Sequence, residues 1–238
     1  MFISFWSCKE SHDFVDLNKN SKMDIFEDPN VEATERAKDI LPFLSIEEKI
    51  AQLESSAPSI PKLGITKYNW MNEALHGIRG DHGEVTTVFP QAIGLAATWN
   101  ISLARQQGEA ISDEARALAN DRGNDRYLDF WSPVINIGRD PRWGRTQEGY
   151  GGDPVLVSQI SKSFIQGLQG NHPKYFKVLS APKHFVANNE EYRRHSGSSE
   201  VPMEVLRDYY FPAFKSSIVD AGAQSIMTAY NALNGIPC

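Results

Sequence analysis

The sequence predicts an α/β fold, a (β/α)8 TIM-barrel-like domain that is incomplete and contains about the first five βα units. Short apolar, β-branched segments bounded by turn residues alternate with longer helical patterns, and this alternation is typical of a parallel sheet. The strand-like segments are 65–70, 92–98, 128–137, 178–187 and 225–230. The helical patterns cover 102–120, 153–170 and 200–221.

Polar residues gather where several of these strand-like segments end. The clusters are Asn72-Glu73 with His76, Arg139-Asp140, Lys183-His184 and Tyr230-Asn231. Side chains at the carboxyl ends of parallel strands line the active-site face of a barrel. A doubly wound sheet also binds ligands there, but it normally has a glycine-rich phosphate loop near its start. The Gly-Tyr-Gly-Gly segment 149–152 has neither that spacing nor a preceding strand, so a barrel is favoured.

Local signals mark helix ends and suggest one boundary in the chain. Ser45 and Glu48 have the spacing of a capping box. Pro154 suits the first position of a helix, and a glycine at 170 follows its last turn. Residues 1–44 are predicted to be a polar lead-in without core-like periodicity. Residues 45–238 are predicted to form a single domain, because no repeat or Pro-rich linker interrupts 50–238.

The composition is that of an ordinary globular protein and argues against nucleic acids and anionic membranes as partners. Of 238 residues, 41% are hydrophobic and the net charge is −6, whereas nucleic acids and anionic membranes attract a basic surface. No apolar segment approaches the roughly 18 residues of a membrane span. The two cysteines, Cys8 and Cys238, make neither a disulfide framework nor a zinc site. The apolar segment 1–8 is either a remnant of an export signal or an unstructured tip; a periplasmic or extracellular location is favoured.

The motifs occur in a fixed order along the chain. They are Asn-Trp-Met-Asn-Glu-Ala-Leu-His-Gly at 69–77, Phe-Pro-Gln-Ala-Ile-Gly-Leu-Ala-Ala-Thr-Trp at 89–99, Gly-Arg-Asp-Pro-Arg-Trp-Gly-Arg at 138–145, Glu-Gly-Tyr-Gly-Gly-Asp-Pro at 148–154, Lys-His-Phe-Val-Ala-Asn-Asn at 183–189 and Met-Thr-Ala-Tyr-Asn-Ala-Leu-Asn-Gly at 227–235. In this order and spacing, residues 32–238 resemble glycoside hydrolase family 3, in particular its β-xylosidase and β-glucosidase branches.

The resemblance implies a retaining exo-β-glycosidase that releases terminal xylose or glucose from oligosaccharides such as plant cell-wall glycans. Such enzymes use a nucleophilic carboxylate and a separate acid/base carboxyl group. In the family, the nucleophile and the acid/base both lie after the part that corresponds to residues 32–238. The chain also has five strand candidates, whereas a closed barrel has eight strands. The chain is therefore expected to be a truncated barrel without catalytic residues. The alternative is a non-catalytic carbohydrate-binding or interaction module that ends naturally at Cys238.

The resemblance also implies which residues hold the sugar. Lys183 and His184 match a Lys-His pair that reaches the sugar hydroxyls, the lysine with three donors and the imidazole with one. Arg145 matches an arginine that hydrogen-bonds the sugar, and a planar guanidinium can bridge two adjacent hydroxyls. Arg139 and Arg142, in the same loop, are interpreted as partners in structural ion pairs with Asp140, Glu148 or Asp153.

Glu73 and three further residues complete the predicted subsite. Glu73 matches a carboxylate that accepts hydrogen bonds from hydroxyls far from the scissile bond. Glucose-acting members more often have aspartate here, so the longer glutamate favours xylose, which lacks the hydroxymethyl group. Tyr230, Met227 and Trp131 match residues that line the same subsite, although core packing is an alternative role for Met227 and Trp131. His76 is interpreted as structural, and no metal-dependent catalysis is implied.

A second motif lies near the N-terminus and resembles a calcium loop. Its positions 1, 3, 5, 9 and 12 carry the oxygen-bearing side chains Asp16, Asn18, Asn20, Asp24 and Glu27. Position 6, where a glycine is usual, is Ser21. A structural Ca²⁺ site and a polar surface loop are the two interpretations.

Overall fold

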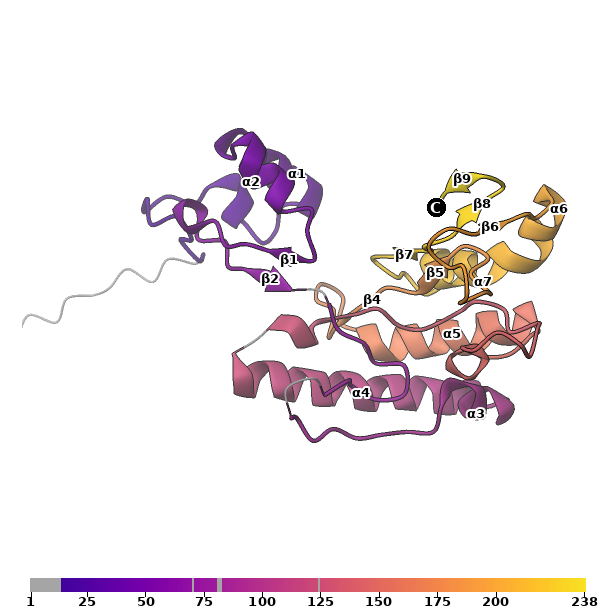
Figure 1. Ribbon diagram of the computed structural model, residues 1–238. Helices are drawn as coiled ribbons and strands as arrows, with labels where there is room; N and C mark the ends of the chain where they lie inside the picture. The colour runs from indigo at the N-terminus through magenta and orange to yellow at the C-terminus, as the bar shows by residue number, and fades with distance from the viewer. Residues whose placement is uncertain (1–13, 70, 81–82, 124) are drawn as a thin grey trace, which may run out of the picture. The chain divides into compact units, whose positions relative to one another are not determined.

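A computed structural model describes residues 14–69, 71–80, 83–123 and 125–238 (Figure 1). The chain divides into two compact units, residues 1–69 and 70–238. The sequence-based boundary lies at residue 45, so the segment 45–69 belongs to the first unit of the structure. The apolar segment 1–8 and Cys8 lie outside the described residues. Within the described residues, no helix is long and apolar enough to span a membrane.

The first unit has a small core of its own. Phe26, Ile60 and Leu63 are buried together, and Ile40 and Leu44 pack against them. The sequence analysis found no core-like periodicity in residues 1–44, and the structure shows that single apolar residues of this segment nevertheless pack against the 60–65 turn. Its elements are α1 (Ala33–Ile40), α2 (Ile46–Ala51), β1 (Ser56–Ala57), β2 (Tyr68–Asn69) and the 3-10 turns Ile25–Glu27, Leu41–Phe43 and Pro61–Leu63.

The predicted capping box at the start of α2 is confirmed. The Ser45 hydroxyl accepts a hydrogen bond from the Glu48 backbone N–H at 3.1 Å, and the Glu48 carboxylate accepts one from the Ser45 N–H at 2.8 Å. These two bonds satisfy backbone donors that a helix start leaves unpaired.

The helices of the second unit follow the predicted pattern with one exception. They are α3 (Ala92–Ala97), α4 (Ile101–Arg122), α5 (Pro154–Gln169) and a continuous helical segment made of α6 (Met203–Val205), the π turn Leu206–Tyr210, α7 (Phe211–Lys215) and the π turn Ser216–Asp220. Short 3-10 turns lie at Asp125–Tyr127 and Thr146–Glu148. Asn100 and Asp153 cap α4 and α5 with their side chains.

The exception is the segment 92–98, which was predicted as a strand and is wrong in type. It forms α3, with Ala92, Leu95 and Ala96 buried. These three residues have the i, i+3, i+4 spacing of one helix face, and the segment is rich in alanine, the strongest helix former. A short apolar run alone does not separate a buried strand from a buried helix.

The strands of the second unit are short and mostly parallel. β3 (Asp129–Phe130) pairs with β4 (Leu179–Ser180), and β5 (Lys183–Phe185) pairs with β7 (Met227–Thr228), both in parallel. A parallel bridge from Val134 to Lys183 joins the two pairs. Since α5 connects β3 to β4 and the 203–220 helical segment connects β5 to β7, the predicted βαβ organisation is confirmed for residues 128–230. In contrast, the predicted strand 65–70 is reduced to β2, which pairs antiparallel with β1.

A second small sheet contains segments that follow β5 and β7 in the chain. β6 (Ser198–Ser199) pairs in parallel with β8 (Ala232–Leu233), which continues as a hairpin into β9 (Ile236–Pro237). Asn234 and Gly235 both have positive φ in the hairpin turn, as expected for an Asn-Gly two-residue turn.

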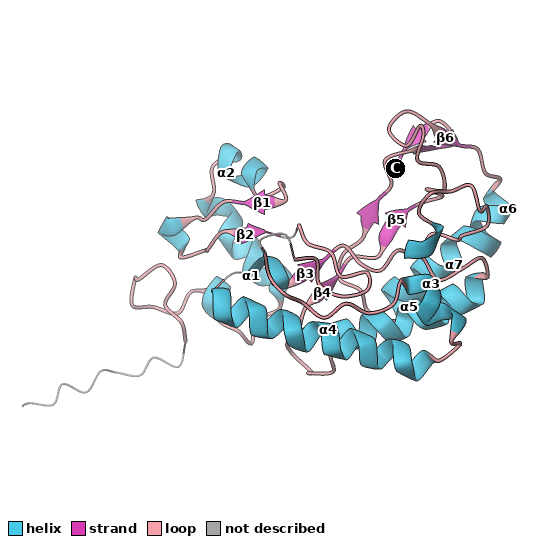
Figure 2. Ribbon diagram, turned by 60° about the horizontal axis from the view of Figure 1, so that its bottom comes forward, coloured by secondary structure: helices cyan, strands magenta, loops and turns pink. Residues whose placement is uncertain are grey.

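Helices α4 and α5 pack side by side beneath the parallel strands (Figures 1 and 2). Two glycines make their close approach possible: a Cβ at Gly108 would lie 2.4 Å from the Phe164 carbonyl oxygen, and one at Gly167 would lie 2.3 Å from that of Arg105. Ile111, Ile160 and Phe164 fill the interior next to this contact. The helices thus fix the positions of the strands that carry the candidate site.

Candidate sugar-binding site

The candidate site lies at β5 and just past the end of β7, where the segment 71–74 passes the end of β3. The Trp131 N–H donates to the Asn72 carbonyl oxygen at 2.9 Å, and the Ala74 N–H donates to the Ser132 hydroxyl at 2.9 Å. These bonds hold Glu73 beside β5, although it is 110 residues from Lys183 in the sequence. The structure therefore brings together two predicted residues that are far apart in the sequence.

Lys183 and Glu73 form an ion pair. The Lys183 Nζ donates to Glu73 Oε1 at 2.5 Å, and the lysine side chain is 1% exposed against 31% for the glutamate. Burial lowers the pKa of Lys183 from its ordinary value, and the charge and hydrogen bond of Glu73 oppose that shift. An ammonium has three N–H donors and this bond uses one. The pair can therefore offer a ligand hydrogen-bond donors from Lys183 and an acceptor from Glu73.

His184 is held by Asn136 and faces Arg145. The His184 backbone N–H and its Nδ1 lie 2.8 and 2.9 Å from Asn136 Oδ1, and Asn136 Nδ2 donates to the His184 carbonyl oxygen at 2.9 Å. Burial, followed by the charges of Lys183, Arg145 and Arg194, lowers the pKa of His184 to about 2. The imidazole is therefore neutral. The sequence analysis expected it to donate to the sugar, but its N–H is already used on Asn136.

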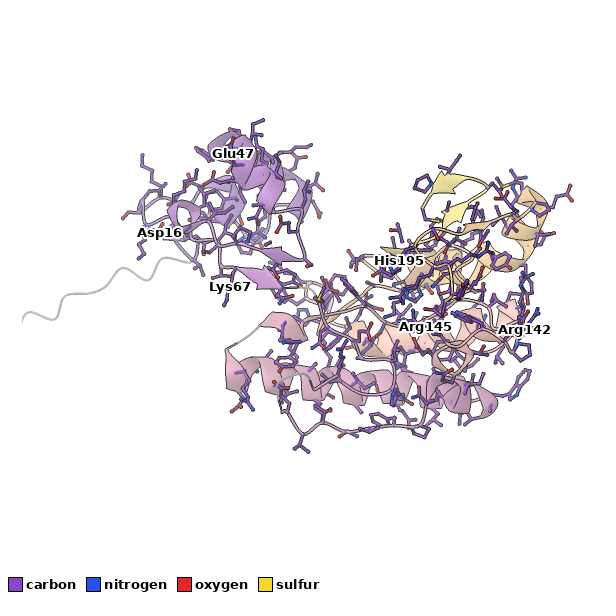
Figure 3. The ribbon with its side chains drawn as sticks, viewed as in Figure 1. Asp16, Glu47, Lys67, Arg142, Arg145 and His195 are labelled. Carbon is purple, nitrogen blue, oxygen red and sulfur yellow. The ribbon has the colours of Figure 1, made fainter. Side chains whose placement is uncertain are left out.

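Arg145 is fixed by a bidentate ion pair. Its Nε and Nη2 donate to the two carboxylate oxygens of Glu148 at 2.9 and 2.6 Å, and its Nη1 lies 3.3 Å from His184 Nε2. Burial disfavours the charged guanidinium, but the hydrogen bonds to Glu148 and the charges of Glu148, Glu191 and Glu73 outweigh it, so the pKa of Arg145 lies above its ordinary value. Figure 3 shows Arg145 on the second unit.

Tyr230 lies past the end of β7 and is half exposed. The Arg194 guanidinium lies 5.3 Å from the centre of its ring, and the His195 ring lies 4.7 Å from it. His195, labelled in Figure 3, belongs to the 187–201 loop after β5. The cation and the aromatic neighbour hold the phenol ring at this end of the strands.

Met227 and Trp131 are placed by their backbones. Met227 is the parallel partner of Lys183 in the β5–β7 register, and Trp131 directly follows β3. Both side chains are half-buried. Their predicted contact with a sugar stays a prediction.

Of the two other arginines in the 139–145 loop, Arg142 has the expected structural ion pair, whereas Arg139 lies 5.8 Å from the centre of the Tyr210 ring. Arg142 pairs with Asp140 at 2.6 Å, which confirms that interpretation for Arg142.

A cleft of about 680 Å³ lies between this loop and the 187–201 loop, and Trp143 and Glu191 line it. The Trp143 indole N–H donates to Glu191 at 3.2 Å, and Glu191 lies 4.0 Å from Arg145. The cleft thus adjoins the candidate site through one carboxylate.

Sequence reasoning missed several residues of this network. Asn136, Glu191, Arg194 and His195 contact predicted site residues directly. Asn136 had a usable signal, because it is the one polar side chain in the apolar segment Val-Ile-Asn-Ile at 134–137. Arg194 and His195 had none, since their contacts depend on how the 187–201 loop folds.

The predicted calcium loop is closed by its own hydrogen bonds. Asp16 accepts from the Ser21 N–H at 2.9 Å, and Glu27 accepts from the Leu17 N–H at 2.7 Å. The side-chain amides of Asn18 and Asn20 turn their Nδ2 atoms, not their oxygens, toward Asp24. Across the part of the chain that the structure describes, no three His, Cys, Asp or Glu side chains are grouped as metal ligands. A cation would need both asparagines to reverse their amides, and Ca²⁺ binding stays a prediction.

Comparison with known proteins identifies the family. The sequence model described as "Glycosyl hydrolase family 3 N terminal domain" matches residues 43–238. The chain belongs to glycosyl hydrolase family 3.

Family 3 relatives with curated names are similar over nearly the whole chain. An exo-1,4-β-xylosidase (bxlB) from Emericella nidulans is 40% identical over 88% of this chain, and a xylan 1,4-β-xylosidase from Xylanibacter ruminicola is 38% identical over 100% of it. The aligned parts are 29% and 28% of those two proteins. The chain thus spans less than a third of the length of these relatives.

Solved family 3 structures share the fold of the chain. A GH3 exo-β-xylosidase (XlnD), in complex with a xylobiose aziridine activity-based probe, matches with a TM-score of 0.82 at 30% identity. The aligned region covers 90% of this chain and 29% of the xylosidase chain. DesR, a β-glucosidase from Streptomyces venezuelae in complex with D-glucose, has a TM-score of 0.72 at 31% identity, with 85% and 25% covered. The second unit therefore has the α/β fold of the family 3 N-terminal domain.

Proposed function

We propose that this chain is the sugar-binding part of a retaining exo-β-glycosidase, in which residues outside the 238 supply the nucleophile and the acid/base. The observation that carries the proposal is the linked set Glu73–Lys183 and His184–Arg145–Glu148. These side chains come from separate segments and meet at the parallel strand β5, and a barrel binds its substrate beside the carboxyl ends of such strands. The chain's relatives are β-xylosidases and β-glucosidases.

The geometry suits a terminal sugar with vicinal hydroxyl groups. The Lys183 ammonium and the Glu73 carboxylate lie 2.5 Å apart, so donors and an acceptor are side by side for neighbouring hydroxyls. The Arg145 guanidinium adds donors in a plane fixed by Glu148. A neutral polyhydroxylated ligand also fits the charge balance of the site, since each cation has an anionic neighbour. An oligosaccharide, such as a plant cell-wall glycan, is therefore the proposed partner, and a nucleic acid is not.

We infer that the second unit is the first part of an eight-stranded barrel. The parallel pairs β3–β4 and β5–β7 are connected by α5 and by the 203–220 helical segment. A closed barrel needs about eight such strands, so further βα units from a longer protein would complete it. Without them, the outer strands β3 and β7, for which the described residues give one paired edge each, keep an open edge, which favours association or poor solubility.

Xylose is the proposed sugar, with glucose as the alternative. Glu73 is 31% exposed and bonded to Lys183, so its carboxylate extends past the buried lysine into the open part of the site. A glutamate reaches about one methylene further than an aspartate would, into space that the hydroxymethyl group of a hexose would need.

A second candidate function is a sugar-binding module without catalysis. Glu73, Glu148 and Glu191, the carboxylates beside the site, are each engaged by a lysine or an arginine. A retaining mechanism needs two carboxyl groups about 5 Å apart that flank the scissile bond, and these ion-paired groups are poorly suited to that task.

One experiment separates the two functions. A full-length version of the protein is assayed on aryl β-xyloside and aryl β-glucoside, and binding of xylose and glucose is measured by calorimetry. Turnover of either aryl glycoside supports the glycosidase. Sugar binding without turnover in the full-length version supports the binding module, and absence of both overturns the sugar site.

We also propose that the Asp16–Glu27 loop binds a structural Ca²⁺ when its asparagine amides reverse. Glu27 is 4% exposed and its carboxylate already spans the start and the middle of the loop. The alternating Asp-x-Asn-x-Asn pattern then supplies the hard oxygen ligands that Ca²⁺ prefers.

A further inference from the structure

Asn136 is bonded to His184 by three hydrogen bonds, and two of them involve backbone groups. The backbone N–H of His184 can only donate, and it lies 2.8 Å from Asn136 Oδ1. The backbone carbonyl of His184 can only accept, and Asn136 Nδ2 lies 2.9 Å from it. These two contacts fix which end of the amide is oxygen, independently of the imidazole.

The fixed amide decides the protonation of the imidazole. Asn136 Oδ1 lies 2.9 Å from His184 Nδ1, and an amide oxygen only accepts, so Nδ1 carries the proton. On the far side of the ring, Arg145 Nη1 lies 3.3 Å from Nε2. A guanidinium only donates, so Nε2 must be the unprotonated nitrogen. The neighbours on the two sides of the ring require the same tautomer.

We propose that Asn136 is a positioning residue that holds His184 in the Nδ1-protonated, neutral tautomer, so that the single lone pair of Nε2 serves only as an acceptor, for Arg145 or for a sugar hydroxyl. Asn136 is 2% exposed, and it therefore acts through His184 without touching a ligand. The part of the proposal that concerns the sugar rests on the proposed function. The part that concerns the tautomer does not.

The charges around the ring support a neutral imidazole. The cations that face it are Lys183 on β5, Arg145 in the 138–145 loop and Arg194 in the 187–201 loop. The carboxylates nearby, Glu148 and Glu191, are bonded to Arg145 and Arg194. A protonated Nε2 would direct its N–H at the Arg145 guanidinium and displace it. Arg145 would then lose its contact with the ring, and the guanidinium plane offered to the sugar would tilt.

The tautomer is measured by ¹H–¹⁵N NMR of ¹⁵N-histidine-labelled protein, in the 238-residue chain or a full-length version. His184 is assigned by the loss of its signals in His184→Gln. We expect signals of a protonated Nδ1 and an unprotonated Nε2, without titration between pH 5 and 8. A protonated Nε2, or a ring that titrates in that range, overturns the proposal. This measurement needs no variant of Asn136 and no enzymatic activity.

Two variants test whether Asn136 is the cause. Asn136→Asp places a carboxylate against Nδ1, so the titration of His184 should move upward by roughly 1–3 pH units, as is usual for a carboxylate neighbour. Asn231→Asp is the control: Asn231 is 6% exposed, and its amide bonds to the Val186 and Ala232 carbonyl oxygens. It adds a buried carboxylate without contacting the ring and should leave the His184 signals unchanged. Equal effects of both variants would assign the tautomer to general electrostatics and contradict the role of Asn136.

The same variants in a full-length enzyme test the link to the sugar. Asn136→Asp should lower kcat/KM by about tenfold or more on the acid side of its new His184 titration, and the loss should diminish as pH rises through it. A pH-independent loss would indicate a merely structural role. If the full-length version has no glycosidase activity at all, the proposed function fails, whereas the tautomer assignment is still decided by NMR.

Discussion

Removing the Lys183 ammonium tests the candidate site most sharply. The Nζ donates once to Glu73, and two N–H donors are left for sugar hydroxyls. A hydrogen bond to a charged group contributes about 1.5–3 kcal/mol, so two at the lower end contribute about 3 kcal/mol. Since about 1.4 kcal/mol corresponds to tenfold in rate, Lys183→Ala should lower kcat/KM of a full-length version by about 10²-fold.

The assay is initial-rate hydrolysis of an aryl β-xyloside, with melting temperature as a check on folding. Lys177→Ala is the matched control, because Lys177 pairs with Asp113 at 2.5 Å on the surface, where the lysine is 35% and the aspartate 68% exposed. The control should leave kcat/KM unchanged. A folded Lys183→Ala enzyme within threefold of wild type would refute the assignment of this residue to the sugar.

Three further predictions concern other parts of the chain. Glu73→Asp should shift the ratio of kcat/KM values from aryl β-xyloside toward aryl β-glucoside, because a shorter carboxylate leaves room for a hydroxymethyl group; an unchanged ratio would remove the reason for favouring a pentose. Asp129 is 4% exposed, and burial raises its pKa from 3.8 to about 6, so the folded state holds this proton more tightly and stability falls as pH rises from about 4 to 6. Asp129→Asn should therefore raise the free energy of unfolding at pH 7 by up to about 3 kcal/mol, and the melting temperature with it. This gain should be lost below about pH 4, and equal gains at pH 4 and 7 would contradict this cause. Finally, Ca²⁺ should raise the melting temperature relative to a chelator by binding the folded loop, and Glu27→Gln should abolish the difference; identical melting curves for the wild type would leave a polar loop.

The sequence predicted most helices of the second unit because their signals are local, and the candidate sugar-binding residues came from the family resemblance. Asp153 and Pro154 mark the start of α5, and the motifs place Lys183 and Arg145. The prediction of a strand at 92–98 was wrong because a short apolar run fits a buried helix as well as a strand. The small core around Phe26 was missed because it is built from isolated apolar residues without periodicity.

The site network required the structure, because its partners are distant in the sequence. Asn136 and His184 are separated by 48 residues, and Lys183 and Glu73 by 110. No spacing rule relates such pairs, since they meet only when parallel strands align. The acceptor role of His184 Nε2 has the same origin: the residue type allows both tautomers, and the positions of Asn136 and Arg145 decide between them.

The most direct test of the central account is glycoside hydrolysis by purified residues 1–238 beside a full-length version. Glu73, Glu148 and Glu191 are held in ion pairs, and a retaining mechanism needs two carboxyl groups placed across the scissile bond. We expect the full-length version to hydrolyse an aryl β-xyloside or β-glucoside and the 238-residue chain to hydrolyse neither. Turnover by the chain alone that disappears in Glu148→Gln would show that it contains its own catalytic carboxylate and would contradict the account.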